Sequence, residues 1–305
     1  MRLVVSGKTG QVATALREAG AGQGVSVIAM GRPELDLADP REGLFKIAEA
    51  RPDVIVSAAA YTAVDKAETD ADMARRVNAA GPAALAELAA DLSIPIVHLS
   101  TDYVFDGSKP TPYVESDATN PLGVYGATKL AGERAIAAAT DNHAILRTAW
   151  VYSPFGGNFL KTMLRLAETR SELRVVDDQR GNPTSALDLA TAVIAVAKNL
   201  LARPDDAKLR GTFHVAGSGE ASWADFAIEI FAVAKSLGGP GANVTRIGTA
   251  DYPTPARRPA NSRLDTFKLK ATHGLTMPGW QASTRHTIER LLAGMDHRLE
   301  EQRSR

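Results

Sequence analysis

Residues 1–13 decide the fold class, and they read Met-Arg-Leu-Val-Val-Ser-Gly-Lys-Thr-Gly-Gln-Val-Ala. The apolar run that ends at Ser6 predicts a short buried strand, and the pattern of residues 13–19 predicts a helix. Between them, Gly7 permits a tight turn, and Gly10 lets the backbone approach a pyrophosphate at the helix N-terminus. A purely structural turn is the alternative. The unit predicts the first strand and helix of a dinucleotide-binding α/β sheet.

The chain continues as alternating apolar runs and helical patterns. Runs at residues 25–30, 54–57, 94–99 and 144–152 predict buried parallel strands. We therefore expect an α/β fold, a doubly wound parallel sheet of the Rossmann type, over residues 1–151, with elements near 185–216 returning to it. Residues 152–305 are expected to form mainly a smaller C-terminal substrate-binding lobe. In that lobe, Ser222 and Asp225 have the spacing of a helix capping box.

The composition excludes several classes of protein. The chain has 305 residues, 35 acidic and 35 basic residues and no cysteine. A net charge of zero gives no reason to expect a nucleic-acid or membrane partner, and the lack of cysteine excludes disulfides and thiol chemistry. No apolar run approaches the roughly 18 residues that a membrane span needs. We expect a cytoplasmic protein.

Residues 100–129 carry the predicted chemistry. Tyr125 and Lys129 are four apart in Gly-Val-Tyr-Gly-Ala-Thr-Lys, so they share a helix face. An ammonium group near a phenol favours the phenolate and lowers the pKa of the tyrosine, which suits proton exchange near pH ~7. Thr101 follows a buried strand and could donate a hydrogen bond to a developing alkoxide. These residues predict the catalytic centre of a nicotinamide-dependent reductase.

The tyrosine–lysine spacing is a weak signal when it is taken alone. The chain has six tyrosines, and a lysine follows four residues later by chance in some chains. The pair gains weight from Thr101 at a strand end and from the glycine turn at the N-terminus. Together these features favour an active site over a coincidence.

Further residues are candidates for holding the cofactor. Arg32 ends the second strand where an acid would favour NAD, so it favours NADP, although a solvated loop cation is nearly as good an interpretation. Asp36 and Leu37 could flank an adenine ring. Small residues after the third strand would let a cofactor lie against the backbone. The cofactor candidates are Gly7, Gly10, Gln11, Val12, Arg32, Asp36, Leu37, Ala60, Tyr61, Thr62, Tyr125 and Lys129.

Two other features have open interpretations. Asn78 lies in a predicted long helix, where its amide could bond the helix backbone, orient Lys129 through water, or be exposed. Arg257 and Arg258 lie in a proline-stiffened loop, and adjacent arginines suit a phosphate or diphosphate. A surface loop with two solvated cations is the alternative for that pair.

The chain resembles the extended short-chain dehydrogenase/reductase family over nearly its whole length. The resemblance is carried, in order, by residues 7–12, 51–56, 62–68, Ser100-Thr101-Asp102-Tyr103-Val104-Phe105, 125–133 and 252–259. Within the family, it is most similar to enzymes that reduce a ketone on a dTDP-linked deoxysugar. The resemblance implies reduction of the C4 ketone of dTDP-4-dehydro-6-deoxy-L-mannose by NADPH or NADH, to give dTDP-L-rhamnose.

The resemblance also implies roles for individual residues. Tyr125 would be the proton donor. Lys129 would adjust the pKa of Tyr125 and bind the ribose, and Thr101 would provide the second hydroxyl at the substrate oxygen. Thr101, Asp102 and Trp150 would touch the sugar, with Arg257 and Arg258 as further candidates for substrate binding. The cofactor would supply the hydride, while the protein contributes positioning and stabilisation of the oxyanion.

The sequence departs from the family at a metal site. Some members bind Mg through glutamates at a dimer contact, and the matching positions here are Ala15, Leu187 and Arg290. We therefore predict no metal, and a possible homodimer that is not bridged by metal.

Two rival functions share the resemblance. Related nucleotide-sugar dehydratases carry Asp-Glu after the threonine, whereas Tyr103 follows Asp102 here. The chain also resembles the regulatory subunit of eukaryotic methionine adenosyltransferase, which binds NADP as a partner protein. The presence of Thr101, Tyr125 and Lys129 favours an enzyme, and turnover of a dTDP-ketosugar would separate these readings.

Overall fold

A six-stranded parallel sheet forms the centre of the larger lobe. The computed structural model describes residues 1–303, with the side chains of residues 1–293. The strand order is β10-β5-β4-β3-β1-β2, and every neighbouring pair is parallel. The strands are β1 (Arg2–Ser6), β2 (Ser26–Met30), β3 (Val54–Ser57), β4 (Ile96–Thr101), β5 (His143–Thr148) and β10 (Gly211–His214).

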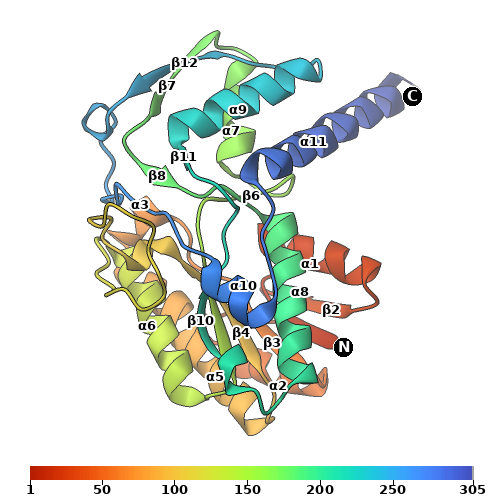
Figure 1. Ribbon diagram of the computed structural model, residues 1–305. Helices are drawn as coiled ribbons and strands as arrows, with labels where there is room; N and C mark the ends of the chain where they lie inside the picture. Colours follow the sequence, from red (N-terminus) through yellow and green to blue (C-terminus); the bar gives the residue numbers. More distant parts are fainter. Residues whose placement is uncertain (304–305) are drawn as a thin grey trace.

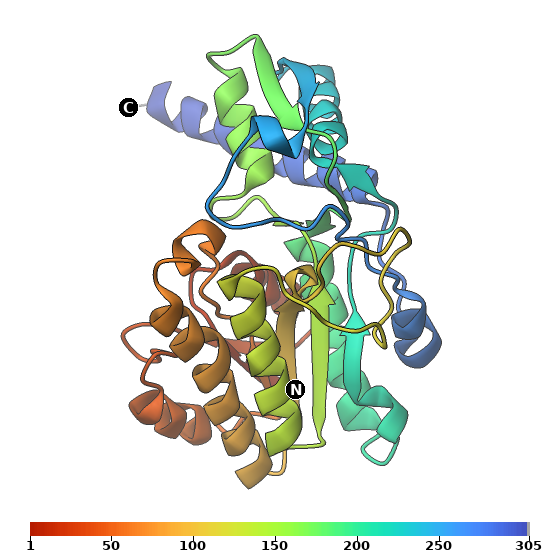
Figure 2. The ribbon, with the colours of Figure 1, turned by 90° about the vertical axis from the view of Figure 1, so that its left-hand side faces the viewer.

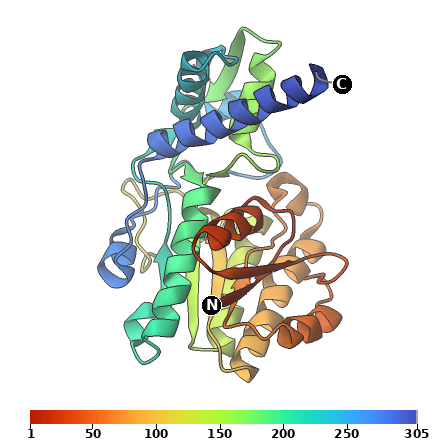
Figure 3. The ribbon, with the colours of Figure 1, turned by 90° about the vertical axis from the view of Figure 1, so that its right-hand side faces the viewer.

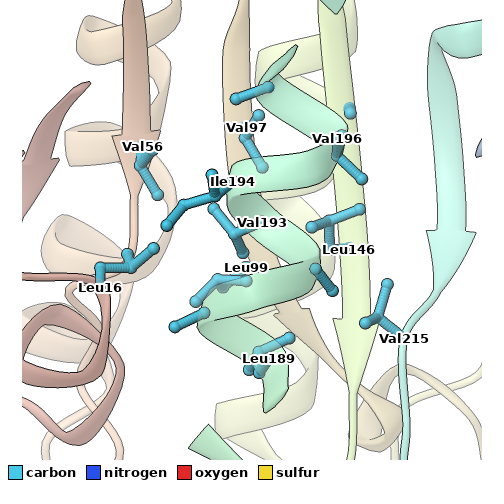
Figure 4. Close-up of a cluster of buried hydrophobic side chains, with 14 of the residues drawn as sticks. Leu16, Val56, Val97, Leu99, Leu146, Leu189, Val193, Ile194, Val196 and Val215 are labelled. Atoms are coloured by element: carbon cyan, nitrogen blue, oxygen red, sulfur yellow. The ribbon is translucent and has the colours of Figure 1, made fainter. Parts of the chain in front are cut away.

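Helices cover both faces of this sheet (Figure 1). Apolar side chains at alternate positions of a strand point to opposite faces, so each strand supplies two cores. In β4, Val97 and Leu99 pack with α1 and α8, whereas Ile96 packs on the other face. Figure 4 shows α8 laid along the first face, with Val193 and Ile194 directed at the strands. The helices of this lobe are α1 (Gln11–Gly22), α2 (Arg41–Glu49), α5 (Gly81–Asp91), α6 (Val124–Ala139) and α8 (Ala186–Ala202).

The strand order reverses between β1 and β3. Ligands of open α/β sheets bind outside the carboxyl ends of the strands at such a switch point. The short α3 (Val64–Ala67) and α4 (Ala71–Arg75) follow β3 at this end. Figure 2 shows the strands of the sheet running up towards the smaller lobe. The candidate site is therefore expected between the sheet's carboxyl edge and that lobe.

The smaller lobe consists of helices around a short parallel strand pair. β7 (Glu172–Val176) pairs with β12 (Asn243–Ile247), and α7 (Phe159–Ala167), α9 (Trp223–Ser236) and α11 (Trp280–Arg303) accompany them. α7 and α9 share an apolar core with Trp280 and Ile288 of α11. Figure 3 shows α11 lying across the smaller lobe above α8. None of the helices within residues 1–303 is long and apolar enough to cross a membrane.

Short strand pairs connect the two lobes. They are β6 (Val151–Tyr152) paired with β9 (Thr184–Ser185), and β8 (Arg180–Gly181) paired with β11 (Ala221–Ser222). The short helix α10 (Phe267–His273) packs on β10 and α8 of the larger lobe. The capping box predicted at the start of α9 is confirmed, because the Ser222 hydroxyl accepts from the Asp225 N–H and the Asp225 carboxylate accepts from the Ser222 N–H.

Two predictions of secondary structure are wrong in detail. The strand expected over residues 144–152 ends at Thr148, because Trp150 has a φ of +48° that turns the backbone into the separate strand β6. The helix expected around Asn78 is not uniform, since residues Arg76–Ala80 form one turn of π-helix between α4 and α5. Such turns open the hydrogen-bond ladder and are frequent at functional sites.

Candidate active site

Thr101 is placed by the end of β4. It is the last residue of the strand and the N-cap of a 3₁₀ turn (Asp102–Val104), where its hydroxyl accepts a hydrogen bond from the Tyr103 N–H. Thr101 Oγ1 donates to Asp102 Oδ1 at 2.9 Å, and both side chains are buried. Burial raises the pKa of Asp102 to about 6, although hydrogen bonds from Ser262 and Thr101 oppose the increase. A hydroxyl and a carboxyl group therefore lie together at the carboxyl edge of the sheet.

Tyr125 lies beside them in the first turn of α6. Its ring packs edge-on against Tyr103, with centroids 5.6 Å apart. The next residue must be small, because a Cβ on Gly126 would lie 2.2 Å from the Tyr103 carbonyl oxygen. Burial raises the pKa of Tyr125 to about 12, while hydrogen bonding to the Thr101 side chain opposes the increase. The net direction of this pKa shift is therefore opposite to the one expected from the neighbouring Lys129, because burial of the phenol dominates.

Lys129 is one turn further along α6 and is only 2% exposed. Its ammonium group points towards β4, where Nζ donates to the Leu99 carbonyl oxygen at 2.6 Å and lies 3.2 Å from His98 Nε2. Burial lowers the pKa of Lys129 to about 8, although the charge of Glu133 opposes the decrease. The lysine thus stays cationic at neutral pH.

A buried ion pair between β5 and α6 supports Lys129 and Thr101. Arg147 of β5 donates to both oxygens of Glu133 on α6, at 2.9 and 2.7 Å. Ser100 of β4 also donates to Glu133. The three residues tie α6 to two central strands. Glu133 lies one turn after Lys129 on α6, and Arg147 precedes Thr148, the neighbour of Thr101 across the β4–β5 pair, so the ion pair fixes the frame on which the candidate site stands.

Sequence reasoning missed part of this network. The pattern places His98 and Ser57 only within apolar strands, and it indicates no role for Glu133 or Arg147. A signal existed for His98, because it interrupts the run Ile94-Pro95-Ile96-Val97-His98-Leu99 at a position that faces the α6 side. A fully buried polar residue in such a strand needs a partner.

The N-terminus of α1 meets the requirements of a pyrophosphate site. Gly10 is its N-cap and has no side chain to occupy the first N–H groups, and the first turn contains no acid. A Cβ added to Gly10 would meet nothing within 4 Å, so the space in front of the helix is open. Gly7 has a φ of +107°, which a glycine adopts at no steric cost. The residues present therefore fit a dinucleotide.

The remaining cofactor candidates line the same edge. The Gln11 side chain is turned away to accept from Ser153 and Asn158, so a cofactor contact of Gln11 falls to its backbone. Asn78 is fully buried and brackets Tyr61, accepting from its N–H and donating to its carbonyl oxygen. Asn78 also donates to Thr128, so it secures the loop that follows β3 rather than orienting Lys129.

The adenine-side candidates differ in exposure. Arg32 is exposed at the tip of β2, and Leu37 is buried in the core beneath α5. Asp36 caps its own turn by accepting from the Ala38 N–H at 2.9 Å. Val12, Ala60 and Thr62 lie at the start of α1 and after β3, with Thr62 exposed. Each of these residues is thus on the carboxyl side of the first three strands.

Trp150 extends the site towards the smaller lobe. It lies two residues beyond Thr148, the neighbour of Thr101 across the β4–β5 pair. Its indole stacks face to face on Trp223 of α9, with centroids 3.6 Å apart and planes within 7°. A Cβ on Gly181 would collide with the indole at 2.5 Å. The ring is therefore held between the two lobes.

The two adjacent arginines have different surroundings. Arg258 donates to both oxygens of Asp65 on α3, at 3.1 and 2.9 Å, whereas Arg257 is exposed. The Arg258 side chain also donates to Thr254 of its own loop. Arg258 therefore binds the loop to the larger lobe, and Arg257 is the arginine whose charge faces solvent.

The positions of the family's dimer metal carry no ligand set. Arg290 forms a two-point ion pair with Glu18, at 2.6 and 2.9 Å, while Ala15 and Leu187 are apolar. Among the residues that the structure describes, no group of three or more His, Cys, Asp or Glu side chains could hold a metal ion.

Comparison with known proteins gives the same family throughout. The family model described as "RmlD substrate binding domain" matches residues 1–293. The chain is 54% identical to the dTDP-4-dehydrorhamnose reductase of Sinorhizobium fredii, over 96% of this chain and 98% of that protein. It is 42% identical to the enzyme of the same name from Escherichia coli, over 95% and 98% of the two chains.

Solved structures agree with these relatives. A dTDP-4-dehydrorhamnose reductase from Clostridium acetobutylicum superposes with a TM-score of 0.87 at 39% identity, covering 96% of this chain and 100% of that one. The Bacillus anthracis enzyme, solved in complex with NADP, gives 0.87 at 32% identity, covering 95% and 99%. A UDP-glucose 4-epimerase from Thermus thermophilus, at 20% identity and a TM-score of 0.76, shares the fold.

Proposed function

This chain belongs to the family of the RmlD substrate binding domain, within the extended short-chain dehydrogenases/reductases, and we propose that Thr101, Tyr125 and Lys129 carry its reaction. The reaction is the NAD(P)H-dependent reduction of the C4 ketone of dTDP-4-dehydro-L-rhamnose, which gives dTDP-L-rhamnose. The observation that carries the assignment of residues is the meeting of the α6 tyrosine and lysine with the strand-end threonine at one edge of the sheet.

Tyr125 is the proton donor in this proposal. A bound NAD(P)H supplies the hydride, and the ketone oxygen must gain a proton as it becomes a hydroxyl. With a pKa of about 12, the phenol is protonated at neutral pH, as a donor has to be. The cation of Lys129, one turn away, stabilises the phenolate that remains after the transfer. Proton transfer from Tyr125 and neutralisation by Lys129 thus form one step.

Thr101 provides the second hydrogen bond to the developing oxyanion. In this structure, its hydroxyl donates to Asp102, and rotation of the O–H about the Cβ–Oγ1 bond is enough to direct it elsewhere. Asp102 and Trp150 flank this point, so they are the residues proposed to contact the sugar. Hydrogen-bond donors that are fixed before the reaction stabilise such a charge at little cost in reorganisation.

The same geometry suggests where the phosphate groups of the cofactor and of the dTDP sugar bind. The pyrophosphate of the cofactor is assigned to the N-terminus of α1, behind Gly7 and Gly10, with Val12 and the segment Ala60–Thr62 beside it. Arg32, exposed at the end of β2, is the proposed contact of a 2′-phosphate and favours NADPH. Arg257 is the proposed ligand of the dTDP diphosphate, and Arg258 holds the loop that presents it.

The proposed assembly is a homodimer that contains no bridging metal, located in the cytoplasm. The support for a metal-free contact is chemical. A divalent cation would need oxygen ligands at these positions, which instead hold the apolar side chains of Ala15 and Leu187 and an arginine, Arg290, that is already paired with Glu18. Sedimentation with and without a chelator tests this, because a metal-bridged dimer would dissociate when the metal is removed.

The experiment that tests the catalytic assignment is Tyr125→Phe. We expect the variant to lose most of its turnover, about 100-fold or more, while NADPH affinity stays nearly unchanged, because only the transferable proton is removed. The assay follows NADPH consumption with the dTDP-4-keto sugar made in place by an epimerase, and NADH and a UDP-linked sugar serve as comparisons.

Equal loss of turnover and cofactor affinity would make Tyr125 a binding residue only. A wild-type chain that binds NADPH and consumes none would instead be a binding subunit.

A further inference from the structure

We propose that His98 is a positioning residue for Lys129, with its imidazole oriented by Ser57 so that one N–H of the lysine remains directed at the cofactor ribose. The inference rests on the function proposed above, in which Lys129 serves Tyr125 and the cofactor. It adds to the active site a residue of the central sheet that touches neither ligand. His98 would act only through the lysine.

A continuous line of polar atoms runs from β3 to α6. Ser57 Oγ lies 3.0 Å from His98 Nδ1, and His98 Nε2 lies 3.2 Å from Lys129 Nζ. Ser57 and His98 are 0% exposed, and Lys129 is 2% exposed. The lysine donates at Nε2, so Nε2 must be the accepting nitrogen and Nδ1 must carry the proton that Ser57 receives. The serine thereby selects the tautomer that the lysine needs.

The number of N–H donors on Lys129 explains why the bond to His98 determines the direction of the remaining donor. An ammonium group has three N–H donors. One is taken by the Leu99 carbonyl oxygen at 2.6 Å and one by His98 Nε2. Two fixed bonds leave a single donor whose direction is set by tetrahedral geometry. That donor is the one with which Lys129 can serve the ribose or the phenol of Tyr125.

Structural packing alone gives no reason for the Ser57–His98 pair. Their neighbours in the strands are apolar, namely Ile55, Val56, Ile96 and Val97, and are fully buried. Replacing two buried hydrogen-bonding partners by apolar groups of similar shape is often neutral or stabilising. Two polar side chains in the middle of a sheet are therefore best explained by the charged group that they serve.

The electrostatic surroundings keep the imidazole neutral, which acceptance at Nε2 requires. Burial holds the pKa of His98 well below its usual value, and the charges of Lys129 and His143 lower it further. From α6, Glu133 raises the pKa of Lys129, and Arg147 of β5 neutralises Glu133 in turn. The neutral histidine thus accepts at Nε2 across the working pH range.

The test compares His98→Leu with His98→Gln. Leucine removes the acceptor, so we expect NADPH affinity to fall about 10-fold or more and the alkaline limb of kcat/KM to move to lower pH, because the ammonium form loses a partner. Glutamine places a carbonyl oxygen near the former Nε2 and should restore most of both properties. His273→Gln, at a buried histidine in α10, is the matched control and should behave as wild type. Wild-type affinity and pH profile in His98→Leu would overturn the inference.

A second measurement remains decisive if His98→Leu does not fold. In the wild-type protein, ¹⁵N spectra of the histidine rings should show His98 as a neutral Nδ1–H tautomer that does not titrate between about pH 5 and 9. Ser57→Ala should shift the ring towards the other tautomer and weaken NADPH binding. An Nε2–H tautomer in the wild type would refute the proposal.

Lys129→Met separates this inference from the function on which it depends. If that variant keeps normal turnover and NADPH affinity, the proposed role of Lys129 is wrong. If Lys129→Met is impaired and both His98 variants are normal, only the role of His98 fails.

Discussion

Two arginine–carboxylate pairs have nearly the same geometry and opposite surroundings. Arg147 meets Glu133 at 2.9 and 2.7 Å, and Arg258 meets Asp65 at 3.1 and 2.9 Å. The side chains of the first pair are 6% and 5% exposed, whereas those of the second are 23% and 42% exposed. The first joins a helix to a strand inside the larger lobe. The second joins α3 to the loop that carries Arg257.

The difference in burial gives the two ion pairs different roles: the buried pair fixes the frame of the site, and the more exposed pair holds a loop in place. Two charges buried without water are held by each other, and removing one leaves the other unsatisfied in a low dielectric. An exposed pair exchanges its partner for water at little cost. The first pair therefore keeps Lys129 and Thr101 in register, while the second holds the loop of Arg257 through a contact that costs little to break.

The largest effect is expected from breaking the buried pair. Arg147→Met leaves Glu133 charged and unpaired, so the free energy of unfolding should fall by about 3–5 kcal/mol. Urea unfolding with an unchanged m-value measures it. The double variant Arg147→Met/Glu133→Leu is the control and should recover much of the loss, because no buried charge remains. A loss below about 1 kcal/mol in the single variant would contradict the frame interpretation.

A smaller effect is expected from Asp102, which is buried without an arginine. Its folded pKa, about 6, lies above the ordinary value of 3.8, so the folded state retains a proton that the unfolded state has lost. Its contribution therefore destabilises the fold progressively as pH rises from about 4 to 6, by up to about 3 kcal/mol. Asp102→Asn should lack this dependence. The measurement is the difference in unfolding free energy between the two proteins across that range, since other carboxylates act in both. A flat difference would show that Asp102 ionises normally.

The smallest effect on stability is expected from the exposed pair. Asp65→Asn should change the unfolding free energy by less than about 1 kcal/mol. Its KM for the dTDP sugar should rise several-fold, because the loop of Arg257 loses its anchor on α3. High salt should reproduce the rise in wild type, since a Debye length of about 3 Å at 1 M screens an exposed pair. Arg285→Gln, in an exposed pair on α11, is the control and should keep a normal KM. An unchanged KM in Asp65→Asn would show that the pair does not position the loop.

The sequence predicted most of what depends on periodicity and little of what depends on distant partners. The parallel sheet, the helix with Tyr125 and Lys129 and the capping box of Ser222 follow from local patterns. The end of β5 does not follow from local pattern because Trp150, with its positive φ, packs on Trp223, a residue 73 positions later.

The charges show the same limit. Arg258 was considered together with Arg257, and nothing in the loop indicates that one of them is paired with Asp65, 193 residues earlier. The pKa of Tyr125 was expected to fall because a cation follows it on the helix. Spacing predicts proximity, but it does not report how deeply a phenol is desolvated or that the lysine is directed at β4.

Gln11 is the first residue of α1, the helix at whose N-terminus the pyrophosphate is proposed to bind, and its side chain also receives hydrogen bonds from Ser153 and Asn158, where the chain leaves for the smaller lobe. A substitution of Gln11 would therefore also remove hydrogen bonds at the junction between the lobes. Arg32 is exposed just beyond β2 in the larger lobe. A change of cofactor preference through residue 32 should therefore leave the junction between the lobes unaltered, whereas a change at residue 11 should affect both. Evolution under a changing cofactor supply would meet the same asymmetry.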